Sequence, residues 1–542
     1  MNNQATAPSD LNQVSGAQLL EQAKALQHQG QLSAAIDLYQ ILLQNLPNHI
    51  NLLHQLAILC LQLNRNAEAK NYIIRALNLD PSNSDFWNIA GVICQRLGQV
   101  EQARESFRRS IDTGFQAIGP LNNLGQLELS LGHLQTALNY FNEGLQIRSH
   151  NTDLLLNKSS VLRAMGEYDE ALDILRFVIK SEPQNFGAHY NMGNIEKELG
   201  NFSLAIEAYK KCLAIQPEFH DAQAALSLIY LVSGNFREGF SLFEKRLLSK
   251  VYQGSPQPTQ LTLWDGNKGW NGNKDNSVDL LITHEQGLGD QIHCLGLMER
   301  VVNKVNSIYW QVPEPLHSML PDAKVHWILP GQIPEQVSHF CPVMSLFERL
   351  EISTEDARLP IPYLKTSYDN PICEKNKRAK IGLVWQGNSN NPTDGKRSVQ
   401  LDEISSFIES LSQELNKETI ELHCIQHVQD FSESDLCLVR EWEKDYGLIC
   451  HFDDIQNLAD TAAIISDLDL LISVDTAVLH LAGALNIPAW GLIAKVNDWR
   501  WLESRDDSIW YPSIRLFRQE KVAGWENVLQ RVKTELVQRF RL

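Results

Sequence analysis

The stretch LNNLGQLELSLGHLQTALNYFNEGLQIRSH, residues 121–150, decides the fold of the first half of the chain. Gly132 lies near its middle, Ala137 follows five residues later, and Phe141 follows four residues after that. A glycine lets the chain turn between two antiparallel helices. The small alanine lets those helices approach closely, and the aromatic ring fills the space that they leave. The stretch therefore predicts a helical hairpin.

The same pattern recurs every 34 residues in both directions. The turn position holds Gly30, Asn64, Gly98, Gly132, Gly166, Gly200 and Gly234, the small position holds Ala35, Ala69, Ala103, Ala137, Ala171, Ala205 and Gly239, and the large position holds Tyr39, Ile73, Phe107, Phe141, Leu175, Tyr209 and Phe243. Pro47, Pro81, Pro183 and Pro217 follow four of the hairpins, as expected where proline ends a helix. The pattern resembles the tetratricopeptide repeat over about residues 17–250, and such arrays form a superhelix whose concave groove binds peptides or proteins.

Three asparagines share this register. Asn123, Asn157 and Asn191 recur at 34 residues on the first helix of three consecutive hairpins. An amide both donates and accepts hydrogen bonds, so we expect this ladder to bind an extended acceptor chain. The array resembles that of the eukaryotic O-linked N-acetylglucosamine transferase, where a similar ladder holds the acceptor peptide. The alternative is that asparagine suits an exposed helix position. Glu21, Gln55, Ile89 and Ala225 stand at the equivalent places in other hairpins.

Composition limits the class of protein. The length of 542 residues indicates several domains. The net charge of −18 argues against nucleic-acid binding, which needs a basic face. Nine cysteines without a CxxC pair are typical of reduced thiols in the cytoplasm. The first residues have no basic start and no apolar core, so no signal peptide is expected. Asp475 interrupts the most apolar stretch, residues 470–496, so no membrane span is expected.

We expect five regions: a flexible N-terminus (1–16), the repeat solenoid (17–250), a linker (251–277) anchored by Trp264 and Trp270, an N-terminal lobe (278–370) and a C-terminal nucleotide-sugar-binding lobe (371–542). In the two lobes, short apolar runs alternate with helical patterns, which predicts parallel sheets with crossover helices. Strands are expected at 278–283, 307–311, 325–328, 380–385, 420–425, 470–473 and 489–492. Nucleotides usually bind at the carboxyl ends of such strands.

The motif LLITHEQGLGDQIHCLGL, residues 280–297, places Asp290 after a strand and a Gly-x-Gly turn, where a helix begins. Asp290 is either a helix cap or a functional carboxylate. In IGLVWQGNSNNPTDGKRSVQL, residues 381–401, a strand leads to Lys396, Arg397 and Ser398. Two cations and a hydroxyl suit a diphosphate, and the alternative is a solvated loop.

The motif DLDLLISVDTAVLHLAGALNIPAWGLI, residues 467–493, ends a strand and opens a helix at Asp475 and Thr476. Free N–H groups at that helix start would favour an anion, while Asp475 could accept from a ribose hydroxyl or cap the helix. His480 either faces the cleft or has a structural role. The aromatic and arginine-rich segment 497–519 suits either a lid or packing between the lobes.

Together these residues resemble a known family. GDQIHCLGL looks like the start of bacterial heptosyltransferases of the ADP-heptose type, and SVDTAVLHLAGALNIPAWGL looks like their nucleotide-sugar site, so the resemblance covers about residues 278–535. It implies a two-lobed, Rossmann-like glycosyltransferase fold of the GT-B type, inversion at the anomeric carbon and no metal. Ala477 stands where the family commonly has glycine, so heptose is not assumed as the sugar.

The resemblance also implies residue roles. Asp290 would be the general base. The donor would be bound by Lys396, Arg397, Gln426, Asp475, Thr476, Ala477 and His480. The expected function is transfer of sugar from a nucleotide-sugar co-substrate, with no other cofactor, to a protein or peptide bound by the repeats. The alternatives are a non-catalytic repeat scaffold and a sugar-nucleotide epimerase. If Asp290 is not the base, His284, Glu285 and His293 are the next candidates.

Overall fold

The computed structural model describes residues 15–114, 117–248, 257–266, 275–366, 378–387, 394–414, 419–521 and 524–540. The chain divides into two compact units, Met1–Ile195 and Glu196–Leu542. Within the described residues, no helix is long and apolar enough to cross a membrane. Among the same residues, no group of three or more His, Cys, Asp or Glu side chains could hold a metal ion.

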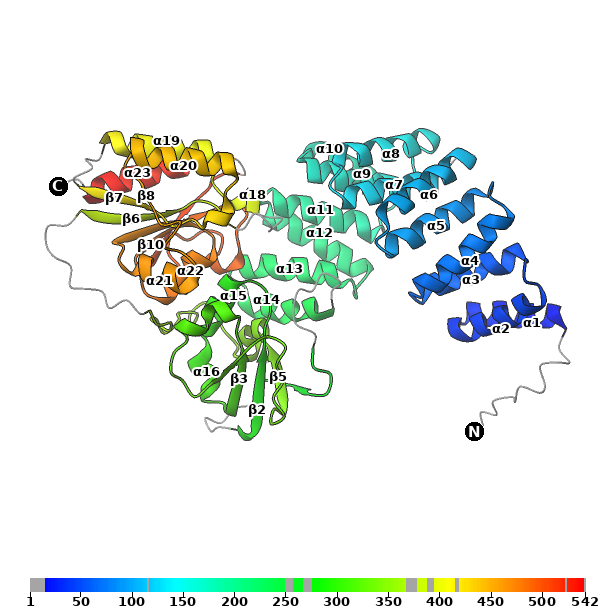
Figure 1. Cartoon of the computed structure of the whole chain (residues 1–542), viewed down its shortest axis with the longest axis horizontal. Coiled ribbons are helices and arrows are strands. Elements are labelled where there is room, and N and C mark those ends of the chain that lie inside the picture. The colour runs from blue at the N-terminus through cyan, green and yellow to red at the C-terminus, as the bar shows by residue number, and fades with distance from the viewer. Residues whose placement is uncertain are drawn as a thin grey trace. The chain divides into compact units, whose positions relative to one another are not determined.

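Antiparallel helix pairs make up the repeat region (Figure 1). The pairs are α1 (Gly16–His28) with α2 (Leu32–Asn45), α3 (Ile50–Gln62) with α4 (Asn66–Leu79), α5 (Ser84–Arg96) with α6 (Val100–Thr113), α7 (Ile118–Ser130) with α8 (Leu134–Ile147), α9 (Thr152–Met165) with α10 (Tyr168–Ser181), α11 (Phe186–Glu198) with α12 (Phe202–Ile215), and α13 (His220–Val232) with α14 (Phe236–Phe243). Their spacing confirms the predicted 34-residue hairpins.

The turn and packing positions behave as the pattern predicts. All seven turn residues have positive φ, from 58° at Asn64 to 82° at Gly166, which is the conformation that glycine adopts at least cost. The six alanines at the small position are fully buried. At the seventh, a Cβ on Gly239 would lie 2.6 Å from Leu231 Cδ2, so even alanine would be crowded there. The repeat fold therefore rests on local backbone conformation and close helix contact.

The second unit contains two parallel sheets in addition to α12 and the last repeat, α13 with α14. The first has the order β1-β5-β2-β3-β4, built from β1 (Thr262–Leu263), β2 (Asp275–Thr283), β3 (Val305–Gln311), β4 (His326–Ile328) and β5 (His339–Pro342). The second has the order β11-β10-β9-β6-β7-β8, built from β6 (Ala379–Val384), β7 (Ile420–Cys424), β8 (Ile449–Cys450), β9 (Leu470–Val474), β10 (Ala489–Ile493) and β11 (Ile514–Arg518). The described pairings between these strands are all parallel.

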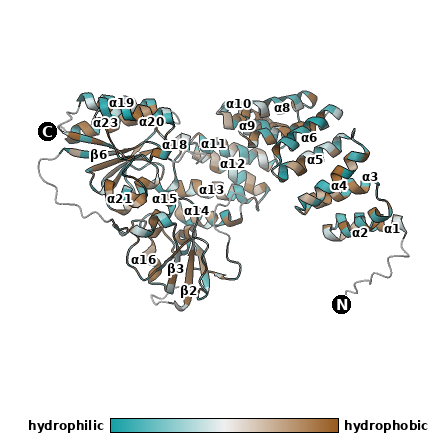
Figure 2. Cartoon of the chain, in the orientation of Figure 1, coloured by the Kyte–Doolittle hydropathy of each residue, from teal (hydrophilic) through white to brown (hydrophobic). Residues whose placement is uncertain are grey.

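Helices cover both faces of the second sheet, and hydrophobic residues run along the strands (Figures 1 and 2). One face carries α19 (Leu401–Glu414), α20 (Glu433–Asp445) and α23 (Glu526–Phe540), and the other carries α21 (Leu458–Ser466) and α22 (Ala477–Ala484). The core joins apolar residues of the central strands, such as Ile381 and Ile472, to Val532 and Leu536 of α23. Burial of these side chains is the main force that holds the lobe together.

The strand order identifies where a ligand would bind. In the second sheet, β6 to β8 extend in one direction and β9 to β11 extend in the other, which is the doubly wound order of dinucleotide-binding folds. The first sheet reverses in the same way between β2 and β5. In such sheets ligands bind beyond the carboxyl ends of the strands at the reversal point. The segments that follow β2, β6 and β9 are therefore the relevant ones.

All seven predicted strands are confirmed, within one or two residues of the expected ends at most of them. The sequence interpretation missed β1, β5, β8 and β11. Within the range expected as a linker, β1 pairs with β5 and Trp264 is buried, while Trp270 lies outside the described residues. The segment 497–519, considered as a lid, ends in a core strand, because β11 pairs with β10 along its whole length.

Candidate functional site

The starts of two helices from different lobes meet at the reversal points. Helix α15 (Leu288–Leu295) follows β2, and α22 follows β9. A Cβ added to Gly289 would lie 3.0 Å from His480 Cδ2 and 3.5 Å from the Cα of Ala477. A side chain at position 289 would therefore crowd the facing helix. Glycine there lets the first turn of α15 lie against the first turn of α22.

Asp290 has a cap interaction and an ion pair at once. Its Oδ2 accepts the N–H of Gly287 at 3.0 Å, which closes the first turn of α15. Its Oδ1 lies 2.7 Å from Nη2 of Arg500, and 24% of the Asp290 side chain remains exposed. Burial raises the pKa of Asp290, Asp498 raises it further, and Arg500 acts in the opposite direction. Asp290 therefore caps α15, as one of the two alternatives predicted. It also forms an ion pair with Arg500, which a helix cap does not require.

Arg500 connects the lobes, and the sequence analysis did not single it out. It lies in the short helix η6 (Trp499–Trp501) of the second lobe, and its side chain is 2% exposed. Its Nη1 lies 2.9 Å from Asp498 Oδ1, and its Nε donates to Nδ1 of His293 at 2.7 Å. In the sequence, Arg500 stands out only as an arginine between two tryptophans. The sequence does not indicate which side chains it contacts.

Asp475 and His480 lie beside each other at the start of α22. The distance from Asp475 Oδ1 to His480 Nε2 is 4.0 Å. Burial, with help from Asp498, raises the pKa of Asp475 to about 6, although Trp501, Arg397 and Arg500 act in the opposite direction. Burial holds the pKa of His480 well below its usual range, so this imidazole is neutral at physiological pH.

The His480 ring is also part of the packing. It stacks on Trp501 with the ring centroids 5.1 Å apart, and its Nδ1 lies 3.2 Å from the hydroxyl oxygen of Tyr511. Thr476 is the N-cap residue of α22, but its side chain makes no capping hydrogen bond and lies 3.2 Å from Ser473 Oγ. The first N–H groups of α22 are therefore not capped by Thr476, and Ala477 occupies the first helical position.

The segment after β6 supplies one described cation, Arg397, which lies on the short helix α18 (Asp394–Arg397). Arg397 Nε lies 3.0 Å from Asp394 Oδ1, and 26% of the Arg397 side chain is exposed. Ser398 Oγ bridges the N–H of Gly387 (3.0 Å) and Asp394 Oδ2 (2.8 Å). Hydrogen bonds therefore join the described residues on either side of this segment. The side chain of Lys396 lies outside the described part of the structure.

Gln426 fixes the backbone at the end of β6. Its Oε1 accepts the N–H groups of Trp385 (2.9 Å) and Gln386 (2.8 Å), and its Nε2 donates to Asp430 Oδ2 at 3.0 Å. The residue is 2% exposed. All three described contacts are with the protein, so a contact of Gln426 with a nucleoside stays a prediction.

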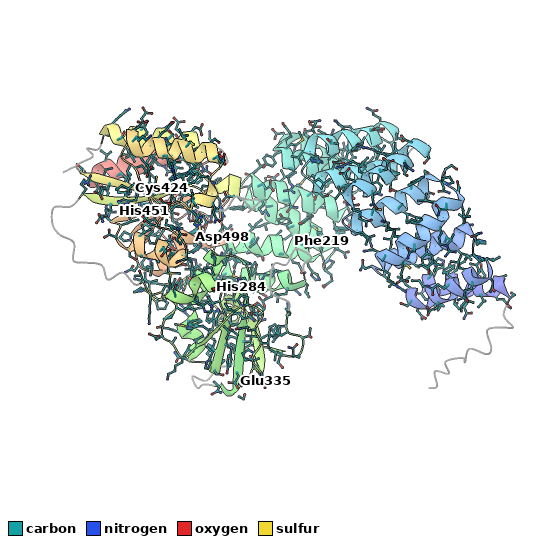
Figure 3. All side chains as sticks on the ribbon, viewed as in Figure 1. Phe219, His284, Glu335, Cys424, His451 and Asp498 are labelled. Atoms are coloured by element: carbon teal, nitrogen blue, oxygen red, sulfur yellow. The ribbon has the colours of Figure 1, made fainter. Side chains whose placement is uncertain are left out.

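The three other candidates for the general base differ in how accessible they are and in whether they already have partners. Glu285 is fully buried and forms two contacts with Arg246, from Nε to Oε1 at 3.1 Å and from Nη2 to Oε2 at 2.8 Å. His293 is fully buried beneath Arg500, and burial holds its pKa well below the usual value. His284 is half-buried, and burial lowers its pKa. Figure 3 labels His284 in the first lobe and Asp498 in the second.

An aromatic cluster joins the last repeat to both lobes. Phe236 of α14 stacks on Trp510 with centroids 5.7 Å apart, and Phe240 meets Trp499 edge-on at 5.3 Å. Phe240 also stacks on Phe347 of the first lobe at 5.1 Å. Both tryptophans are almost completely buried, which favours the packing alternative for their segment over a lid.

The asparagine ladder bridges consecutive repeats. Asn123 Nδ2 donates to Asn88 Oδ1 at 2.9 Å, and Asn157 Nδ2 donates to Asn122 Oδ1 at 2.7 Å. Asn191 Nδ2 lies 3.4 Å from its acceptor, Ser160 Oγ. All three asparagines are half-buried, so they have a structural role between first helices. Binding of an acceptor chain by their remaining hydrogen-bonding capacity stays a prediction.

A separate groove lies at the other edge of the second sheet. It has a volume of about 850 Å³ and is lined by the first residues of β9, β10 and β11, including Leu470, Ala489 and Ile514. It is therefore at the amino ends of these strands, whereas Asp475 follows the carboxyl end of β9. We assign the candidate site from the side-chain chemistry at the carboxyl ends and not from this groove.

Comparison with known proteins identifies the repeats. Models of the tetratricopeptide repeat match residues 26–93, 84–113 and 187–219. An 80-residue stretch is 35% identical to protein FlbA of Caulobacter vibrioides, covering 15% of this chain and 13% of that protein. The N-terminal region therefore consists of tetratricopeptide repeats, and most of that bacterial protein has no counterpart in the matched stretch.

Solved repeat proteins give weaker likenesses. A tetratricopeptide repeat protein from Parabacteroides merdae is 17% identical, with a TM-score of 0.39, and the match covers 42% of this chain and 91% of that one. Yeast Tom70 is 19% identical, with a TM-score of 0.38, and the match covers 45% of this chain and 53% of that one.

Proposed function

We propose that the two-lobed half is an inverting glycosyltransferase of the GT-B type that needs no metal ion. It takes a sugar from a nucleotide-sugar donor in the cytoplasm and transfers it to a protein or peptide that the repeats recruit. One observation carries the proposal: the reversal points of two parallel sheets face each other, with a partly exposed carboxylate on one side and an uncapped helix start beside an arginine on the other.

The second lobe has the chemistry of a diphosphate site. The N–H groups at the start of α22 carry a partial positive charge, and Thr476 does not cap them with its side chain. The partly exposed guanidinium of Arg397 acts electrostatically on both Asp475 and His480, so it lies near the same helix start. A phosphate group there would interact favourably with both charges.

The first lobe supplies the base. Asp290 retains an exposed fraction of 24%, and burial raises its pKa toward the range in which a carboxylate is an effective proton acceptor. In the proposed reaction Asp290 takes the proton of the acceptor hydroxyl, and the oxygen forms a bond to the anomeric carbon. The bond from that carbon to the diphosphate breaks on the opposite face, and the nucleoside diphosphate leaves with the electron pair, stabilised by Arg397 and α22.

A second candidate function, a non-catalytic repeat scaffold, is supported by the internal contacts of the site residues. Both oxygens of Asp290 already have partners, Gly287 and Arg500, and Arg397 is paired with Asp394. A repeat scaffold with an inactive transferase-like half would also show these internal contacts. Each carboxylate oxygen has two lone pairs, so the existing partners do not exclude a proton acceptor role.

Ligand binding separates the two functions. The experiment is a thermal-shift panel of ADP, UDP, GDP and their sugars with the full chain. A ligand at 100 times its Kd stabilises the folded state by about 2.7 kcal/mol, which is a measurable shift. We expect one nucleotide series to raise the Tm, and Arg397→Ala to reduce that shift while Arg505→Ala does not, since Arg505 is exposed and pairs with Asp507. A Tm that no nucleotide changes supports the scaffold.

A further inference from the structure

We propose that Arg500 is a positioning residue that holds the Asp290 carboxylate from the opposite lobe, on a segment that the last repeat fixes in place. The inference rests on the proposed function, in which Asp290 accepts the acceptor's proton. It assigns a role to a side chain that does not itself touch the substrate.

The contacts of Arg500 are all internal. Its guanidinium reaches Asp290 (2.7 Å) and His293 (2.7 Å), both on α15 of the first lobe, and Asp498 (2.9 Å) on its own segment. Its side chain is 2% exposed, whereas that of Asp290 is 24% exposed. A substrate hydroxyl can therefore approach Asp290 but not Arg500. Arg500 acts through the carboxylate that it orients.

The segment that carries Arg500 is itself held rigidly. The guanidinium lies over the Trp499 ring at 4.4 Å, and the backbone carbonyl of Arg500 accepts the Nε1–H of Trp510 at 2.9 Å. These two tryptophans pack on Phe240 and Phe236 of the last repeat. A change in the last repeat would thus be transmitted to the Asp290 contact through rings that are already in contact.

The backbone next to Arg500 supports a constrained geometry. Leu502 has φ 53° and ψ −179°, a conformation that is strained for a residue with a side chain and persists only where neighbours impose it. Its carbonyl accepts from Asn497 Nδ2 and from Arg518 Nη1, each at 2.9 Å. The segment therefore turns sharply beside Arg500, and several hydrogen bonds maintain the turn.

The charges around Asp290 give the inference a measurable signature. The titratable and charged groups that face Asp290 or Arg500 come from several elements. They are Asp498 next to η6, His293 and Cys294 on α15, His284 and Glu285 after β2, Asp475 and His480 at the start of α22, and Tyr511. Arg500 lowers the pKa of Asp290, and Asp498 raises it. Loss of the guanidinium and loss of the Asp498 carboxylate should therefore move the titration of Asp290 in opposite directions.

The first experiment measures kcat at saturating donor as a function of pH. We expect Arg500→Gln to lower kcat on the order of 100-fold, the cost of misplacing a reacting group by about 1 Å. The acid limb, which reports protonation of the base, should move to higher pH in Arg500→Gln and to lower pH in Asp498→Asn. Arg500→Lys keeps one charged contact and should show a smaller loss. The control Arg505→Gln removes an exposed arginine of the same segment and should change neither quantity.

The second experiment asks whether Arg500 acts only through Asp290. In an Asp290→Asn background, Arg500→Gln should lower kcat by less than about threefold, because the carboxylate that Arg500 holds is already absent. An equal loss with and without the Asp290 carboxylate, or an acid limb that does not move, would overturn the inference. If Arg500→Gln does not fold, Arg500→Lys and Asp498→Asn provide the same comparison.

Failure of the proposed function has a different outcome. If the parent protein releases no nucleoside diphosphate from any donor, the glycosyltransferase proposal fails. The contact is then judged by urea unfolding of Asp290→Asn, Arg500→Lys and the double variant. A loss of stability in the double variant that is smaller than the sum of the single losses supports the holding contact. A loss in the double variant that equals the sum of the two single losses would overturn the proposed contact.

Discussion

Replacing Asp475 by asparagine should stabilise the ligand-free protein at neutral pH. Burial and Asp498 raise the pKa of Asp475 from 3.8 to about 6. The pKa of Asp475 is higher in the folded state than in the unfolded state, so the protonated group contributes favourably to folding stability. This contribution is complete below pH 3.8 and is lost as the pH rises through about 6. At neutral pH the ionised carboxylate therefore costs stability, by about 3 kcal/mol at 1.36 kcal/mol per pKa unit. Asparagine has nearly the same shape and no charge.

Tryptophan fluorescence during urea unfolding reports on the α/β half, which contains Asp475, since all of the 12 tryptophans except Trp87 follow residue 260. We expect Asp475→Asn to be more stable than the parent by about 3 kcal/mol near pH 7.5 and by about 1 kcal/mol near pH 4.5. Asp402→Asn, an exposed change in the first turn of α19, should stay within about 0.5 kcal/mol at both. A variant that is equally or less stable than the parent at both pH values would refute the electrostatic reasoning.

Further predictions concern other parts of the molecule. Asp290→Asn should fold and bind donor normally but lose turnover by roughly 10²–10⁴-fold, whereas Asp460→Asn, which removes a matching cap carboxylate from α21, should leave turnover unchanged in the same release assay. Phe240→Ala should destabilise the α/β half by about 3–5 kcal/mol in urea, and a loss under about 1 kcal/mol would contradict its place in the aromatic cluster. The triple change of Asn123, Asn157 and Asn191 to alanine should weaken acceptor use and leave donor hydrolysis intact, while Gln135→Ala on the exposed face of α8 should change neither activity. Unchanged transfer by the triple variant would remove the ladder from acceptor binding.

The repeat region could be predicted from the sequence because its structure is local. A turn residue, a small residue and a ring at fixed spacing determine a hairpin without reference to distant parts of the chain. Even Asn64, the exception among the glycines, follows the rule, since asparagine adopts positive φ more readily than most residues. The central strands were predictable for a similar reason, because each is a short apolar run.

The missed strands lie where such signals are weak. β1 and β8 have two residues each and lie at the edges of their sheets, and β5 contains a histidine and a proline. Two of the five residues of β11 are arginines, so the strand resembled the rest of an aromatic and arginine-rich segment. Pairing with β10 decides its conformation, and pairing is not visible in a single sequence.

The candidate site was predictable in position but not in its partners. The strand-to-helix pattern indicated where Asp290 and Asp475 would lie. The contact of Asp290 with Arg500 joins residues 210 positions apart in the chain, and only the packing of two lobes against each other creates it. The same is true of Glu285, which sequence reasoning treated as a substitute base and which instead pairs with Arg246 of the last repeat segment.

Release of nucleoside diphosphate is the decisive measurement for the proposed glycosyltransferase activity. The full chain is incubated with each nucleotide sugar, with and without EDTA, and the diphosphate product is quantified. We expect release from one donor in the presence of EDTA, reduced roughly 10²–10⁴-fold in Asp290→Asn. The glycosyltransferase proposal is contradicted if no donor is turned over, or if Asp290→Asn releases product within a few-fold of the parent.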